Sequence, residues 1–271
     1  MYTFMFIDTH CHIDFSIFDS DRIHILTNIF SENYFVPNSK LLGLIIPGVS
    51  EPQWKTCLAL ASEYKNVYFC AGIHPWFVAS NKLSTDDLFA ALLKTLDSPS
   101  CVAIGECGLD KTHVSDFSLQ QEIFDVHLQV AKHTKQPLIL HGTKTHNELI
   151  RQIKSASPVS GGVIHGFTGS YELAKTYMDM GFYIGVGGSI TYERAKKTRD
   201  TIARLPLTAL VLETDAPDMP LAGMQGQRNS PEHIFTIANV LAALRNEPLA
   251  LIAEQTTKNA SDIFNVPFSV L

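Results

Sequence analysis

The stretch FMFIDTHCH at residues 4–12 joins an apolar run to a set of polar side chains. The run Phe4–Ile7 is short and entirely apolar, which is typical of a strand buried on both faces of a parallel sheet. Side chains alternate along an extended chain, so Asp8, His10 and His12 lie on the same side of it. The stretch therefore predicts a buried strand that ends in two imidazoles able to bind one metal ion.

Seven further segments resemble this strand, and stretches with helical periodicity separate them. Neighbouring parallel strands need such crossover connections, and eight parallel strands are the number that closes a barrel. The predicted strands are Phe4–Ile7, Leu41–Ile46, Val67–Ala71, Val102–Gly105, Leu138–Leu140, Gly162–Ile164, Phe182–Val186 and Leu210–Leu212. We therefore predict an α/β fold, a (β/α)8 TIM barrel, in which residues 1–271 form a single domain.

A doubly wound open sheet is the main competing fold, because it has the same alternation of strands and helices. Such sheets commonly bind nucleotides through the loops G-x-G-x-x-G or G-x-x-x-x-G-K-[ST]. The first motif does not follow the first predicted strand, and the second motif does not occur anywhere in the sequence. The number of strands and the missing loops favour the barrel.

Three helices have recognisable starts in the sequence. Ser118 and Gln121 predict a capping box at the start of one helix. A second helix is expected to begin at Tyr171, after Ser170, and a third after Ser230, which precedes a proline. In the third helix, apolar residues recur at a spacing that suits packing against a sheet. These residues are Ile234, Ile237, Ala238, Leu241 and Leu244.

The composition is that of an ordinary globular protein and excludes disordered and fibrous classes. Of 271 residues, 45% are hydrophobic and 18% are charged, and the net charge of −6 offers no overall attraction to nucleic acid. No apolar run reaches the roughly 18 residues of a membrane span, and the first residues lack the basic region of a signal peptide. Five cysteines without a C-x-x-C pair fit a reducing compartment. We expect a cytoplasmic protein with no membrane contact and no obligate protein partner.

Ligand-type side chains gather at the carboxyl ends of the predicted strands. In a barrel these ends converge on one face, the face that carries the active site. Four histidines and two carboxylates are more than one tetrahedral ion needs, and they suit two divalent ions that share a bridging carboxylate, for which Glu106 is the candidate. Nitrogen and oxygen ligands without thiolate fit Zn²⁺, Mn²⁺ or Mg²⁺. The six predicted metal ligands are His10, His12, Glu106, His141, His165 and Asp215.

A pair of divalent ions predicts hydrolysis. Two ions can activate a water, polarise the electrophile and stabilise the leaving oxygen, as in the hydrolysis of phosphodiesters and amides. Asp215 can act both as a ligand and as a proton acceptor. Glu213 lies on the same side of its strand as Asp215, and two converging buried carboxylates need a compensating cation. We therefore predict Asp215 and Glu106 as the catalytic residues.

Other polar residues carry weaker indications. His74 follows a strand, where it can reach a substrate phosphate or orient a metal ligand. Gly185–Ser189 can bind phosphate through backbone N–H groups, but a tight turn is the favoured interpretation. Cys11 and Cys107 adjoin proposed ligands, and we expect both to be packing residues. Histidines in loops or helical segments are expected to be structural. They are His24, His113, His127, His133, His146 and His233.

Four segments of the chain resemble the TatD-related metal-dependent hydrolases. The resemblance runs nearly end to end, and the segments occur in the family's order. They are Ile7–His12, Gly105–Asp110, His165–Gly169 and Glu213–Pro217. The resemblance implies a (β/α)8 barrel with a divalent-metal centre. It also implies DNA or another phosphoester as the substrate, since members are described as deoxyribonucleases, some acting from the 3′ end of single strands.

The resemblance further assigns a set of ligands to each of two ions. The set for the first ion is His10, His12, Glu106 and Asp215. The set for the second ion is Glu106, His141 and His165. Both sets are drawn from the six residues that the strand ends indicate.

The chain departs from the family pattern at two positions. Thr143 stands where many members have an arginine, which removes a bidentate phosphate contact, and Lys144 beside it supplies a point charge. Asp218 stands where an aromatic residue is usual, which removes a possible base-stacking surface. The variant Asp-Met-Pro sequence at 218–220 indicates a divergent subgroup. Lys144 and His74 are the predicted substrate contacts.

Two other functions compete with a deoxyribonuclease. The first is an amidohydrolase or lactonase that acts on a small molecule with the same two ions. Those enzymes commonly carry a modified lysine on the fourth strand, where this chain has Glu106. The second is a catalytically inactive, metal-stabilised nucleic-acid-binding module, against which the apparently complete ligand set and the lack of a broad basic surface argue.

Overall fold

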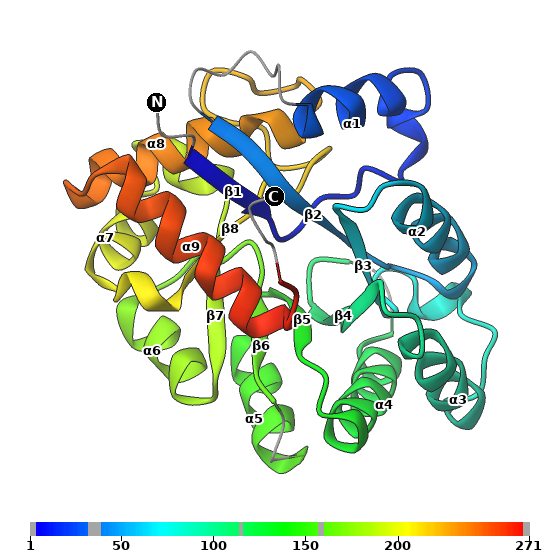
Figure 1. Ribbon diagram of the computed structural model, residues 1–271. Helices are drawn as coiled ribbons and strands as arrows, with labels where there is room; N and C mark the ends of the chain where they lie inside the picture. The colour runs from blue at the N-terminus through cyan, green and yellow to red at the C-terminus, as the bar shows by residue number, and fades with distance from the viewer. Residues whose placement is uncertain (1–3, 32–38, 114–115, 157–159, 268–271) are drawn as a thin grey trace. The chain divides into compact units, whose positions relative to one another are not determined.

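Eight strands form one parallel sheet whose order follows the sequence from β1 to β8, and helices alternate with them (Figure 1). The computed structural model describes residues 4–31, 39–113, 116–156 and 160–267. The strands are β1 (Phe4–Asp8), β2 (Ser39–Pro47), β3 (Val67–Ala71), β4 (Cys101–Asp110), β5 (Leu138–Thr143), β6 (Gly162–Ile164), β7 (Phe182–Val186) and β8 (Leu210–Leu212). The sheet and its helices confirm the predicted (β/α)8 barrel.

The chain comprises two compact units. The first unit is Met1–Ile46, Gly166–Asp179 and Tyr183–Leu271, and the second is Pro47–His165 and Met180–Phe182. The helices of the first unit are α1 (Arg22–Phe30), α6 (Tyr171–Asp179), α7 (Lys196–Arg204), α8 (Ile234–Arg245) and α9 (Leu249–Phe264). Those of the second are α2 (Glu51–Glu63), α3 (Thr85–Leu96), α4 (Phe117–Thr134) and α5 (His146–Ala156). Within the described ranges, no helix is both long enough and apolar enough to cross a membrane. The single-domain organisation stays a prediction.

In the first unit, β1 contacts both β2 and β8. Beyond the end of β1, the backbone N–H and the hydroxyl of Thr9 donate to the carbonyl of Leu212, at 3.0 and 2.9 Å. Helix α9 packs against both strands, and its Asn259 amide donates to the carbonyls of Leu207 and Leu210. Because these bonds fix the carboxyl ends of β1 and β8 side by side, the polar residues that follow the two strands are brought together.

In the second unit, β4 is longer than the sequence predicts. The apolar run predicts a strand at Val102–Gly105, but the strand continues through Asp110, and all of its residues are buried. Its second half pairs with β5, where Gly108 lies opposite His141. The prediction was wrong at this end because it stopped at the polar Glu106, whereas this buried strand carries the charged side chains itself.

The three predicted helix starts have different outcomes. Helix α6 begins at Tyr171 as predicted, and the hydroxyl of Ser170 accepts a bond from the third backbone N–H of the helix, at 3.3 Å. Helix α4 begins at Phe117, where the carboxylate of Asp116 accepts from the N–H of Ser118, so the predicted capping box is wrong. A short 3₁₀ turn over Pro231–His233 precedes α8. Of the apolar stripe on α8, all residues but the last are buried.

Candidate metal centre

The first unit contains a cluster of two histidines and one carboxylate. His10 and His12 follow β1, and Asp215 follows β8. The Oδ1 atom of Asp215 lies 3.5 Å from Nε2 of His10 and 3.8 Å from Nε2 of His12. All three residues are buried, and their ligand atoms lie within 4.8 Å of one another. This is a set of donors that one divalent ion can share.

The backbone explains why these three side chains meet. The chain continues its parallel pairing beyond the two strands, because His12 N donates to the carbonyl of Ala216 at 2.7 Å and Asp215 N donates to that of His10 at 2.8 Å. Asp215 itself has a φ of 57°, in the left-handed region that aspartate tolerates better than most residues. The turn continues with Asp218, whose N–H donates to the Asp215 carbonyl.

Asp8, which shares the side of the strand with the two histidines, has a supporting place instead. Its carboxylate accepts from the backbone N–H of His10 at 3.2 Å and from the N–H and hydroxyl of Thr214 at 3.0 and 2.6 Å. Complete burial raises the pKa of Asp8 to about 7, against the effect of the Thr214 bonds. Asp8 therefore ties the segment after β1 to the segment after β8.

Glu213 is not among the three ligand-type residues of the first cluster. It is fully buried, and its Oε1 accepts a bond from the N–H of Gly166. A side chain at Gly185 would bring its Cβ within 2.4 Å of Oε2 of Glu213. Gly185, the penultimate residue of β7, therefore makes room for a buried carboxylate, which is a specific reason for glycine at this position.

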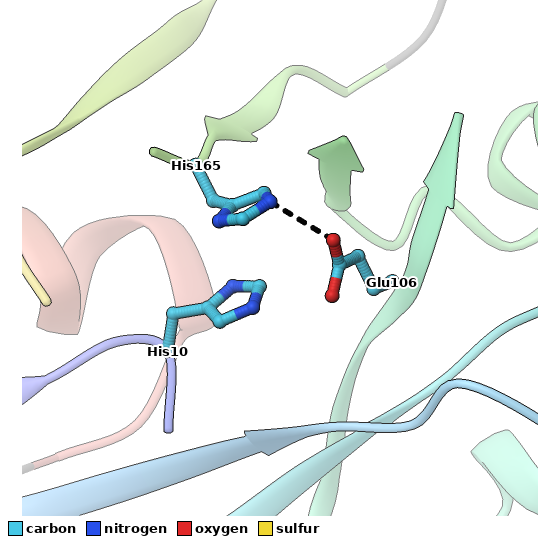
Figure 2. A group of neighbouring side chains, drawn as sticks. All are labelled: His10, Glu106 and His165. Carbon is cyan, nitrogen blue, oxygen red and sulfur yellow. Dashed lines mark ion pairs between the residues drawn. The ribbon is translucent and has the colours of Figure 1, made fainter. Parts of the chain in front are cut away.

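The second unit contains a cluster around Glu106. In Figure 2, His165 points towards the Glu106 carboxylate, and its Nε2 lies 2.9 Å from Oε1. The same oxygen lies 3.0 Å from Nδ1 of His141 and 3.4 Å from Nε2 of His74. The nitrogens of His141 and His165 that face Glu106 are 3.1 Å apart. Strands β4 and β5 and the residue after β6 thus bring two imidazoles to one buried carboxylate oxygen, with a third imidazole beside it.

Asp110, at the end of β4, fixes the orientation of His141. Its Oδ2 lies 3.1 Å from Nε2 of His141 and accepts the indole N–H of Trp76 at 2.8 Å. Its Oδ1 accepts the N–H and hydroxyl of Thr112. Although burial opposes ionisation, bonds from these three residues hold the pKa of Asp110 well below its usual range. An ionised Asp110 favours a proton on Nε2 of His141, which leaves the Nδ1 lone pair facing Glu106.

Asp110 received no role from the sequence alone. The signal was present, because Asp110 lies four positions after Glu106, so both side chains lie on one side of an extended strand. It was missed because the predicted strand ended before both of them.

We expect Asp110→Asn to weaken metal binding by about 10- to 100-fold, which is typical when a carboxylate that orients a ligating histidine is lost. The neutral amide no longer enforces the His141 tautomer. Competition with a chromophoric chelator measures the metal affinity. Asp116→Asn, at the exposed cap of α4, is the matched control and should leave the affinity unchanged. Equal affinities in Asp110→Asn and the unmodified protein would contradict this role.

His74 contacts Glu106, the carboxylate of the second cluster. Its Nδ1 accepts the backbone N–H of Trp76 at 3.1 Å, so its proton lies on Nε2, which faces Glu106. Burial lowers the pKa of His74 to about 4, against the effect of the Glu106 carboxylate. The neutral ring thus holds Glu106 in place. Of the two roles that the sequence left open, this arrangement favours the orientation of a ligand.

Thr143 and Lys144, the second and third residues after His141, differ in their surroundings. Thr143, where the family resemblance leads us to expect an arginine, has its hydroxyl 3.1 Å from Nε2 of His141. Lys144 follows the end of β5, is exposed, and has a φ of 57°. A substrate contact by Lys144 or by His74 stays a prediction.

The donor chemistry of both clusters fits divalent metal ions. Each cluster combines imidazole nitrogens with carboxylate oxygens and contains no thiolate, a mixture that suits Zn²⁺ and Mn²⁺ and admits Mg²⁺. The described cysteines are all free and buried, and burial raises the pKa of Cys11 and Cys107 well above the usual range. A (β/α)8 barrel with such clusters at the ends of its strands is an arrangement that metal-dependent hydrolases use.

Comparisons with known proteins define the family. Residues 7–265 match the family described as TatD related DNase. The metal-dependent hydrolase YjjV of Escherichia coli (strain K12) is 41% identical over 264 residues, covering 97% of this chain and 98% of the relative. A metal-dependent hydrolase of Haemophilus influenzae is 37% identical over 271 residues, covering 96% and 99%. The crystal structure of YjjV matches with a TM-score of 0.86 at 40% identity, covering 97% and 98%. The chain belongs to the family of TatD-related metal-dependent hydrolases.

Proposed function

We propose that this metal-dependent hydrolase is a phosphodiesterase that cleaves DNA. The observation that carries the proposal is the pair of buried histidine–carboxylate clusters, one after β1 and β8 and one on β4, β5 and after β6. The description of the family as DNases supports DNA as the substrate. The ligands are buried, and in a site that excludes water each electrostatic interaction with the substrate is stronger than in bulk solvent.

We propose that the protein holds two divalent ions, Zn²⁺, Mn²⁺ or Mg²⁺, with the ligand sets that the family resemblance assigns. In a (β/α)8 barrel the carboxyl ends of the strands carry the active site, which supports this assignment. When bound, such ions lower the pKa of a water and polarise the phosphoryl oxygens. The ligands of the first ion are His10, His12, Glu106 and Asp215. Those of the second are Glu106, His141 and His165.

The side chains of this chain then have distinct roles in hydrolysis. A water attacks the phosphorus and its proton passes to the Asp215 carboxylate. The bond from phosphorus to the leaving oxygen breaks, the leaving oxygen keeps the electron pair and takes up a proton from solvent, and Asp215 then releases its proton to solvent. The side chain of Asp215 is 12% exposed, so the carboxylate can reach such a water. His74 and Asp110 position Glu106 and His141 respectively. Lys144, exposed after β5, supplies a positive charge for a substrate phosphate.

We further propose a cellular location for the protein and its independence of partner proteins. The described cysteines are all buried free thiols, which supports a reducing compartment and a cytoplasmic location. We propose that the protein acts without an obligate protein partner. Sedimentation of the purified, active protein at its working concentration is the measurement that tests this independence.

A timed digestion of 3′-labelled single-stranded DNA tests the function. Metal-stripped protein is resupplied with Mg²⁺, Mn²⁺ or Zn²⁺, and the His165→Ala variant is run beside it. We expect cleavage by the unmodified protein alone, with at least one metal. If no metal restores cleavage although ions bind, the phosphodiesterase proposal is wrong. A parallel panel of cyclic amides and lactones then tests the amidohydrolase or lactonase alternative, and no turnover of any substrate supports a binding module.

A further inference from the structure

The loop after β3 presents a large aromatic side chain beside the second cluster. Trp76 is 49% exposed, whereas the other tryptophan, Trp54, is 4% exposed and its indole N–H is bonded to the carbonyl of Gly72. The Trp76 ring stacks on His113, with centroids 5.3 Å apart and planes inclined by 20°. An exposed tryptophan whose ring already forms a stacked pair is a surface suited to a further flat ring.

Trp76 is fixed to the residues that surround Glu106. Its indole N–H donates to Oδ2 of Asp110, the same oxygen that lies 3.1 Å from Nε2 of His141. Its backbone N–H donates to Nδ1 of His74, and the ring of His74 meets the indole edge-on at 5.3 Å and 89°. The indole is therefore held by its polar edge, while about half of its surface stays open to solvent. A ring immobilised in advance loses little conformational entropy when a ligand binds to it.

We propose that Trp76, together with His113, is the stacking platform for a nucleobase next to the phosphate that is cleaved. This inference rests on the proposed phosphodiesterase function and names a contact that distinguishes the substrate. Every base has a flat π-face, so the platform selects unpaired bases with little preference among them.

Binding to a catalytically silent protein tests the platform directly. In the Asp215→Asn background, the intrinsic fluorescence is titrated with a short single-stranded DNA and with an abasic strand of equal length and charge. We expect the DNA to quench the exposed Trp76 and the abasic strand to leave it unchanged. Trp76→Ala should weaken DNA binding by about 5- to 100-fold, which is the effect of losing one stacked base. Binding of the abasic strand should not change.

Two further variants separate stacking from damage to the loop. Trp76→Phe keeps an aromatic face and should recover most of the affinity for DNA. Phe89→Ala is the control, because it removes a partly exposed ring on α3 that contacts His133 and not the second cluster. In the active protein, Trp76→Ala should raise KM more than it lowers kcat, and Phe89→Ala should change neither substantially.

The outcomes distinguish this inference from the proposed function. If DNA is cleaved but the abasic strand binds as tightly as DNA to both the parent protein and Trp76→Ala, the platform is wrong and the phosphodiesterase stands. If DNA quenches Trp76 and binds more weakly to Trp76→Ala, but no metal supports cleavage, the platform stands and the proposed function fails.

Discussion

Asp215→Asn is expected to lower kcat for phosphodiester cleavage by at least about 10³-fold while the protein stays folded. The amide cannot accept the proton of the attacking water, and it is a poorer metal ligand than the carboxylate that faces His10 and His12. The substitution is nearly isosteric. The backbone bonds of the turn, from Asp215 N and Asp218 N, do not involve the side chain. Steady-state kinetics measure the loss, and circular dichroism during heating checks the fold.

Asp218→Asn is the matched control for this experiment. It removes the same charge three residues further along the chain, at an exposed position. We expect its kcat to stay within a few-fold of the unmodified value, because an exposed carboxylate is screened by solvent. Equal losses in both variants would indicate that the general negative charge matters rather than a proton acceptor at Asp215. Full turnover by Asp215→Asn would overturn the assignment.

Removal of divalent ions is expected to abolish activity and to lower the thermal stability of the protein. The native chain holds the ligands in place, whereas the unfolded chain does not, so bound metal favours the native state. At a free metal concentration 100 times Kd, this linkage adds about 2.7 kcal/mol to the free energy of unfolding. Calorimetry on dialysed protein, before and after metal is restored, measures the shift, and elemental analysis counts the ions. We expect two ions per chain.

The variant Glu106→Gln tests whether the bound ions use the predicted carboxylate ligand. Glu106 is 2% exposed and belongs to both proposed ligand sets. The variant should bind fewer ions and gain less stability from added metal than the unmodified protein. Glu122→Gln, which makes the same change at an exposed position on α4, is the matched control, and its response to metal should equal that of the unmodified protein. An unchanged melting temperature in the unmodified protein, with less than one ion bound, would exclude the metal centre.

Most of the fold could be predicted from the sequence because a parallel barrel buries its strands on both faces. Such strands read as continuous apolar runs, and β3, β6, β7 and β8 have the predicted bounds. Strands β1, β2 and β5 are longer than predicted by one to three residues, and β4 differs most, because Glu106 and Asp110 lie within it. An apolar run therefore predicts a buried strand only as far as the first charged side chain, even when the strand continues beyond it. The cap of α4 was misassigned to Ser118 because Asp116, two residues earlier, has an equally suitable oxygen.

The candidate site was predictable to the extent that it depends on the ends of strands. His10 and Asp215 could be paired because both follow strands of the same barrel. The role of His74 could not, because it depends on which ring nitrogen accepts the N–H of Trp76. A structural histidine such as His127 differs only in its surroundings: it lies on α4, and its Nε2 accepts a backbone N–H in the core. Position in the sequence distinguishes a histidine at a strand end from one on a helix. Which ring nitrogen carries the proton follows only from the hydrogen bonds in the structure.

The pairing of β1 with β8 also sets an order of events during synthesis. The contact between Thr9 and Leu212 joins residues 203 positions apart, and Asp8 meets Thr214 across 206 positions. His10 and His12 therefore leave the ribosome long before the carboxylate that completes their cluster. Contacts between such distant segments form late, since the intervening chain must first be ordered. A nascent chain that has not yet reached Asp215 lacks part of the first ligand set. Metal binding by this set would therefore show that β8 has paired with β1.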